Sequence, residues 1–347
     1  MVTPAASATP WPWQRTLLTQ TLATQRAHAL LLHGAQDSGP LAFALALARA
    51  WLCETPAAER PDGLACGRCA GCHLVDERSH PDLRLVVPET LREAAGLGGD
   101  DSPGADDGGS GRKTRKPSAE IKVDAVRAAL DFAALTPSRA RLKVLVVHPA
   151  EALNAVAANA LLKTLEEPPG AMRFLLGCGA PHALLPTIRS RCQAVALPTP
   201  ERAAALAWLA AQDIAEPEVV LDACGGEPLA ALEHARAGRD AAAWRQFPAA
   251  VRQGRGAALA GWPLPVLVDA LQKLCHDHAL LALGEPARFF PFLAGERAAP
   301  LERLTTLAAW LRAQARHADH PWSAPLAVDA LVQHVSGVLA HRPPSSA

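Results

Sequence analysis

The stretch from Lys143 to Leu197 constrains the fold more than any other part of the sequence. Short apolar runs suited to strands buried on both faces of a parallel sheet alternate there with segments of helical spacing. Pro168 and Pro169 end the first helix, because proline cannot continue one. This order predicts an α/β sheet. The expected strands are Val144–Val147, Phe174–Leu176 and Ala194–Leu197, and the expected helices are a segment with Val156, Ala160, Leu161 and Leu165 on one stripe and Ala183–Ile188.

A strand, a glycine loop and a helix near the N-terminus have the layout of a phosphate-binding loop. The strand is expected at His28–His33, and the loop runs from Gly34 to Pro40. The helix at Leu41–Leu52 is apolar on nearly every side, which suits a buried position. Asp82–Pro88 is predicted to form another strand, and residues 121–134 resume helical spacing.

This loop lacks the residues that bind phosphate and magnesium. A working loop carries Lys and then Ser or Thr after its last glycine, whereas Gly39 is followed by Pro40 and a leucine. Pro40 removes a backbone N–H from the cradle, and Asp37 adds negative charge to it. The strand Val144–Val147 leads into His148–Pro149, where an ATPase needs carboxylates. We therefore expect no ATP hydrolysis by this chain, with residual nucleotide binding as the alternative.

Four of the eight cysteines form a C-x12-C-x2-C-x2-C array. Two-residue gaps allow neighbouring thiolates to turn toward one ion, and nearby glycines permit the tight backbone. Four sulfurs complete a tetrahedral coordination sphere, so a zinc ion here would be structural. Disulfides and a redox role are the alternatives, and a cytoplasmic setting disfavours disulfides. The expected ligands are Cys53, Cys66, Cys69 and Cys72, with His73 and His80 as spare donors.

Composition narrows the range of functions. The chain has 34 basic and 34 acidic residues, so it has no positive excess for binding a nucleic-acid backbone. The apolar runs are too short to span a membrane, and residues 1–12 lack the pattern of a signal peptide, so a cytoplasmic location is expected. Residues 94–118 are rich in Gly, Asp, Arg and Lys, which predicts a disordered insertion. Its basic half could contact DNA or could be a solvated linker.

Helical patterns fill the chain after residue 200. Three helices are expected at Glu201–Gln212, Glu216–Cys224 and 227–235, followed by stripes of three-to-four spacing. His278 lies on one stripe and is expected to be a satisfied interface residue, not a ligand. Trp262, Trp310 and Trp322 are expected core or interface anchors. The stripes are Leu267, Leu271, Leu274, His278 and Leu281; Leu301, Leu304, Ala308, Leu311 and Ala315; and Val328, Leu331, Val335 and Val338.

Two stretches, Asn159–Pro169 and the triplet Ser190-Arg191-Cys192, resemble the delta-prime family of clamp-loader subunits of bacterial DNA polymerase III, which are AAA+ proteins. The resemblance implies an α/β domain of the AAA+ type with an inserted zinc module, then a helical lid and a helical collar. The corresponding ranges are 1–199 for the AAA+ domain, about 53–80 for the zinc module, 200–240 for the lid, 241–342 for the collar and 343–347 for a frayed tail.

The resemblance also implies a role in replication. It implies a stator subunit that hydrolyses no ATP and assembles with the ATPase (gamma/tau) subunits and the delta subunit. The assembly would load the sliding clamp onto primer-template DNA as part of the polymerase holoenzyme. Arg191, flanked by Ser190 and Cys192, would be an arginine finger for a neighbour's ATP site, because a guanidinium pairs with several phosphate oxygens. A surface salt bridge is the alternative role of Arg191.

Two functions from other classes remain open on the sequence. An ATP-hydrolysing motor subunit is the first, and the altered loop at Gly34–Pro40 argues against it. A zinc-dependent DNA-binding module is the second, and the neutral net charge argues against it.

Overall fold

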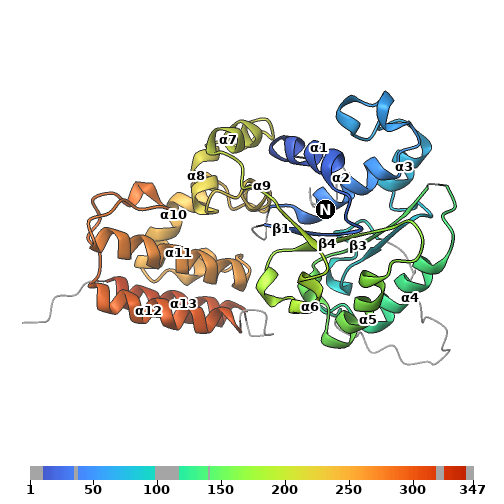
Figure 1. The fold of residues 1–347 in the computed structure, drawn as a ribbon. Coiled ribbons are helices and arrows are strands. Elements are labelled where there is room, and N and C mark those ends of the chain that lie inside the picture. Colours follow the sequence, from blue (N-terminus) through green and yellow to red (C-terminus); the bar gives the residue numbers. More distant parts are fainter. Residues whose placement is uncertain (1–10, 35–37, 98–116, 140, 318–323, 341–347) are drawn as a thin grey trace, which may run out of the picture. The chain divides into compact units, whose positions relative to one another are not determined.

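The computed structural model describes residues 11–34, 38–97, 117–139, 141–317 and 324–340. The chain forms two compact units with the division between Pro200 and Glu201 (Figure 1). None of the described helices combines the length and hydrophobicity needed to cross a bilayer.

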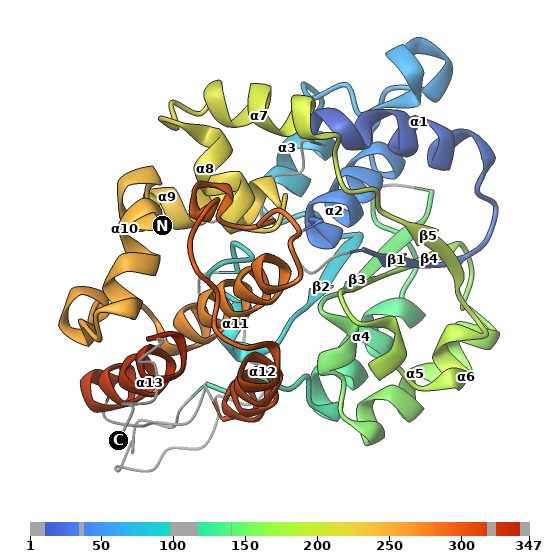
Figure 2. The same cartoon turned by 90° about the vertical axis from the view of Figure 1, so that its left-hand side faces the viewer.

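A five-stranded sheet in the order β2-β3-β4-β1-β5 forms the centre of the first unit, with β2 and β5 at its edges (Figure 2). Every strand pair is parallel, as the alternation of strands and helices predicts. All residues of β3 are buried, which explains the apolar run Val144–Val147 that makes up most of the strand. The strands are β1 (Ala29–His33), β2 (Leu83–Val86), β3 (Lys143–Val147), β4 (Met172–Cys178) and β5 (Gln193–Ala196).

Helices cover both faces of this sheet (Figure 1). Because successive strand residues point to opposite faces, Val144 and Val146 pack in the core with α2, whereas Leu145 and Val147 pack in the core with α4 and α5. Two separate layers of buried side chains result, one on each face. The helices of this unit are α1 (Arg15–Thr24), α2 (Pro40–Trp51), α3 (Ala70–Asp76), α4 (Val123–Ala134), α5 (Ala155–Glu166) and α6 (Pro186–Arg189).

The second unit is helical throughout its described residues. One continuous cluster of buried side chains includes residues from each of its helices. Within it, the fully buried carboxylate of Asp277 accepts hydrogen bonds from the backbone N–H groups of Arg288, Phe289 and Phe290, which fixes the loop after α11. The helices are α7 (Arg202–Ala210), α8 (Pro217–Ala223), α9 (Pro228–Arg236), α10 (Ala241–Arg252), α11 (Leu264–Ala282), α12 (Leu301–Ala315) and α13 (Ala324–Leu339).

Three details differ from the sequence predictions. Val156 is 61% exposed, because it is nine positions from Leu165 and that spacing places the two on opposite sides of α5. The expected helix at 183–188 is instead a 3-10 turn, Pro181–Ala183, followed by α6. Ala95 is 1% exposed and packs in the core, so the start of the predicted insertion is part of the folded unit.

Several predictions concern residues outside the described ranges. They are Asp37, most of the predicted insertion (98–116), Trp322 and the predicted tail (343–347).

Candidate functional site

Arg191 lies between the end of α6 and the edge strand β5. Its backbone N–H donates to the carbonyl of Ile188, which continues the last turn of the helix. The side chain is 31% exposed, so the guanidinium is accessible at the surface of this unit. A short helix that ends at a sheet edge therefore presents this cation, as the sequence order of the elements predicts.

The guanidinium of Arg191 is held from two sides. Its Nε donates to Oε1 of Glu166, the last residue of α5, at 2.5 Å, and its Nη2 donates to the same oxygen. On the other side, Nη1 donates to the carbonyl of Thr187 at 2.9 Å and approaches Oγ of Ser190 at 3.4 Å. Arg191 thus forms a surface salt bridge with Glu166, the alternative that the sequence left open, while its side chain stays partly exposed.

The neighbours of Arg191 in the triplet have supporting positions. The Ser190 hydroxyl donates to the carbonyl of Thr187 at 3.1 Å, which ties the two residues of the last turn together. Cys192 packs against the core that contains α4 and α5. Burial raises the pKa of the Cys192 thiol to about 11, so this side chain is a neutral thiol near neutral pH.

The structure describes the two ends of the altered phosphate loop, Gly34 at one end and residues 38–40 at the other. Gly39 adopts a left-handed conformation with φ 74°, and Pro40 begins α2. The carbonyl of Ser38 accepts a hydrogen bond of 2.6 Å from the buried side chain of Gln14. At the other end, a Cβ added to Gly34 would lie 2.3 Å from Oγ of Ser38, so the backbone and this side chain are in close contact.

Side chains fill the space where β3, β4 and α2 converge. A Cβ added to Gly177 would lie 2.7 Å from Nδ1 of His148 and 3.3 Å from Cβ of Pro40. Burial lowers the pKa of His148, which makes the neutral imidazole the dominant form near neutral pH. Two residues that replace the expected catalytic groups, Pro40 and His148, therefore both lie beside the β4 residue Gly177 at the carboxyl end of the sheet.

Glu151 provides a carboxylate near this end of the sheet, and its Oε1 already accepts hydrogen bonds from the backbone. Oε1 accepts hydrogen bonds from the backbone N–H groups of Gly179 at 2.8 Å and Ala180 at 3.1 Å. Oε2 is buried. The carboxylate thus fixes the turn after β4, a contact that the sequence alone did not reveal.

The second candidate site is the cysteine cluster beside α3. The four sulfurs of Cys53, Cys66, Cys69 and Cys72 lie within 4.8 Å of one another. Two of the sulfur pairs are separated by 3.8 Å and 3.9 Å. Zinc–sulfur bonds of about 2.3 Å in a tetrahedron place sulfurs about 3.8 Å apart, so the cluster matches the size of a zinc site.

Three thiols of the cluster have a shifted pKa: hydrogen bonds lower the pKa of Cys66 and, outweighing burial, that of Cys69, whereas burial raises the pKa of Cys72. The backbone N–H of Cys72 donates to the sulfur of Cys69 at 3.4 Å, and that of Cys66 donates to the sulfur of Cys53 at 3.5 Å. The Thr55 hydroxyl is the main cause that lowers the pKa of Cys66 to about 5. None of the eight cysteines is in a disulfide, so the predicted alternative of a disulfide pair is not what the structure contains.

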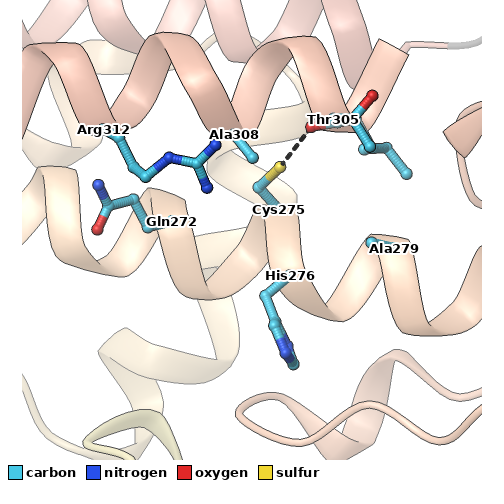
Figure 3. Close-up of a pocket in the computed structure, with 8 residues that line it drawn as sticks. Gln272, Cys275, His276, Ala279, Thr305, Ala308 and Arg312 are labelled. Carbon is cyan, nitrogen blue, oxygen red and sulfur yellow. Dashed lines mark hydrogen bonds between the residues drawn. The ribbon is translucent and has the colours of Figure 1, made fainter. Parts of the chain in front are cut away.

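Two further observations concern the second unit. A cavity of about 340 Å³ lies between α11 and α12, with Gln272 and Arg312 at one end and Cys275 in its wall (Figure 3). Cys275 donates its thiol hydrogen to the carbonyl of Leu304 at 3.4 Å. His278 is 4% exposed, and its Nδ1 has no hydrogen-bond partner among the described residues.

The fold and the first unit's site define a parallel α/β protein with a phosphate-loop layout and altered loop chemistry. A family model described as DNA polymerase III, delta subunit, matches residues 13–201. The chain therefore belongs to this family.

Named relatives agree with this assignment. DNA polymerase III subunit delta' of Pseudomonas aeruginosa is 39% identical over 64% of this chain and 60% of its own length. The subunit delta' of Escherichia coli is 33% identical over 64% of this chain and 60% of its own length. The tau subunit of Escherichia coli is 32% identical over 48% of this chain and 20% of its own length. This chain thus spans about 60% of the length of the two delta' relatives.

Proposed function

We propose that this chain is a clamp-loader subunit of DNA polymerase III that hydrolyses no ATP and supplies Arg191 to the ATP site of a neighbouring subunit. Membership of the DNA polymerase III delta subunit family and the delta' relatives support the assembly. The single observation that carries the donor role is the partly exposed guanidinium at the sheet edge. A guanidinium can pair with several phosphate oxygens and remains charged throughout turnover.

The packing at the carboxyl end of the sheet supports the absence of ATP turnover in this chain. Pro40 and His148 both lie beside Gly177 there, and Pro40 supplies no N–H to a phosphate. Glu151, the carboxylate at this end, already accepts two backbone hydrogen bonds. An ATP-hydrolysing motor subunit, the first rival function, would need a lysine and magnesium-binding groups at these positions.

The ion pairs around the cysteine cluster argue against the second rival function, a zinc-dependent DNA-binding module. Arg49 pairs with Asp76 at 2.6 Å and Arg139 pairs with Glu54 at 2.7 Å. Arg60 donates to two backbone carbonyls. These cations are engaged within the chain, so fewer remain for a phosphate backbone. We propose that the cluster binds one structural zinc ion, which joins the segments that carry its four ligands.

We further propose that the second unit comprises a lid (200–240) and a collar (241–342) that contributes to assembly with the ATPase (gamma/tau) and delta subunits. The sliding clamp and primed DNA would be engaged through that assembly, in the cytoplasm. Helices α8 and α10, which lie on either side of residue 240, pack against each other in one core. Lid and collar would then move together as one body.

Assembly and nucleotide binding test this function together. The purified chain should co-purify with gamma/tau and delta subunits, and it should bind no ATP in an equilibrium titration with magnesium, because its loop lacks the required groups. The ATPase subunit titrated in parallel is the positive control. Tight, magnesium-dependent ATP binding to this chain alone would contradict the proposal, as would failure to assemble.

A further inference from the structure

Glu166 forms an ion pair with the Arg191 guanidinium. It is the one carboxylate that pairs with Arg191 within the described ranges, and it comes from a different helix, α5. The two residues are 25 positions apart in the sequence, so the fold creates the pair. Because the carboxylate is 46% exposed, the pair lies at the surface.

The contacts leave one end of the guanidinium for a partner. Of its five N–H groups, those of Nε and Nη2 that face Glu166 are occupied, and Nη1 is held by Thr187 at 2.9 Å. The contact of Nη1 with Ser190 is long, at 3.4 Å. No described residue accepts a hydrogen bond from the second N–H of Nη2. The end of the side chain therefore presents two donors for a partner: the second N–H of Nη2, and the N–H of Nη1 that makes the long contact with Ser190.

We propose that Glu166 is a positioning residue that fixes the inner edge of Arg191 so that its outer end meets the phosphate of a neighbour's ATP. The inference rests on the proposed function of Arg191. A long arginine side chain has several rotatable bonds, and a fixed carboxylate limits the orientations of its planar group. Positioning of this kind lowers a barrier by holding reacting groups in a productive geometry. Glu166 itself touches no phosphate in this arrangement.

A double-mutant cycle in the reconstituted loader tests the inference. Glu166→Ala should lower kcat for DNA-dependent ATP hydrolysis about tenfold with little change in KM for ATP, because the nucleotide is bound by the neighbour. Arg191→Ala should cause a larger loss. Adding Glu166→Ala to Arg191→Ala should have no further effect, because Glu166 acts only through that arginine. Glu166→Gln keeps an oxygen acceptor at the same place and should recover most of the activity.

Glu167→Ala is the matched control, because it removes the adjacent carboxylate, which forms no ion pair among the described residues. It should leave kcat unchanged. Wild-type turnover in Glu166→Ala with a defective Arg191→Ala would overturn the positioning role alone. An equal loss from Glu166→Ala in both backgrounds would also overturn it, since the effect would then be structural. Wild-type turnover in Arg191→Ala would overturn both the positioning role and the proposed function.

Discussion

Replacing Arg191 by alanine should reduce the ATPase rate of a reconstituted loader by about 10³-fold or more, since arginine fingers contribute roughly 10³–10⁵ to phosphoryl transfer. Clamp loading should fall with it. The variant should fold and assemble normally, because its ion pair with Glu166 is partly exposed and exposed pairs contribute little to stability. Steady-state ATP hydrolysis, clamp loading on primed DNA and gel filtration of the assembly measure these three outcomes.

Arg189→Ala is the matched control for this experiment. Arg189 is also exposed and ends α6, but its guanidinium donates one long hydrogen bond, to the carbonyl of Pro181 at 3.4 Å, and forms no ion pair among the described residues. We expect this variant to keep close to wild-type turnover. An equal loss of turnover in both variants would indicate that any positive charge at this surface has the effect. Unchanged turnover of Arg191→Ala would contradict the donor role altogether.

Replacing Cys66 and Cys69 together by serine should abolish zinc binding and unfold the segment around α3. The wild-type chain should contain about one zinc ion, since four sulfurs at these separations close a tetrahedral site. Structural zinc contributes on the order of 10–16 kcal/mol of apparent binding free energy in small zinc modules. Without zinc, the packing of such a short segment does not provide enough free energy to keep it folded. Metal analysis of protein purified without added zinc and limited proteolysis measure the two effects.

His73→Ala separates the four-sulfur site from a mixed site. His73 lies on α3 next to Cys72 and is exposed, so it is the nearest alternative ligand in the sequence. The variant should retain one zinc ion per chain. Wild-type protein without metal, or loss of the metal in this control, would contradict a site of four cysteines.

The sheet could be predicted from the sequence because its strands are short apolar runs separated by helical segments and prolines. Val144–Val147 is an example: its unbroken apolar sequence corresponds to burial on both faces. The orientation of individual helix residues was less certain. The predicted stripe on α5 included Val156, but a nine-residue spacing from Leu165 turns it to the solvent.

The candidate site could be predicted only in part. The spacing of the four cysteines predicted a cluster, and the structure places their sulfurs together. The partner of Arg191 could not be found in this way, because Glu166 and Arg191 meet through the packing of α5 against α6. Likewise, the contact between Glu151 and the turn after β4 depends on the register of β3 and β4. Such pairings depend on tertiary structure, which local patterns do not specify.

The most direct test of the donor role is a structure of the assembled loader with a transition-state analogue of ATP and magnesium bound. We predict that Nη1 and Nη2 of Arg191 lie within hydrogen-bond distance of the phosphate mimic in the neighbouring subunit, with the chain's own loop at Gly34–Pro40 empty. A neighbour's ATP site completed by another residue, with Arg191 remote from every nucleotide, would contradict the account.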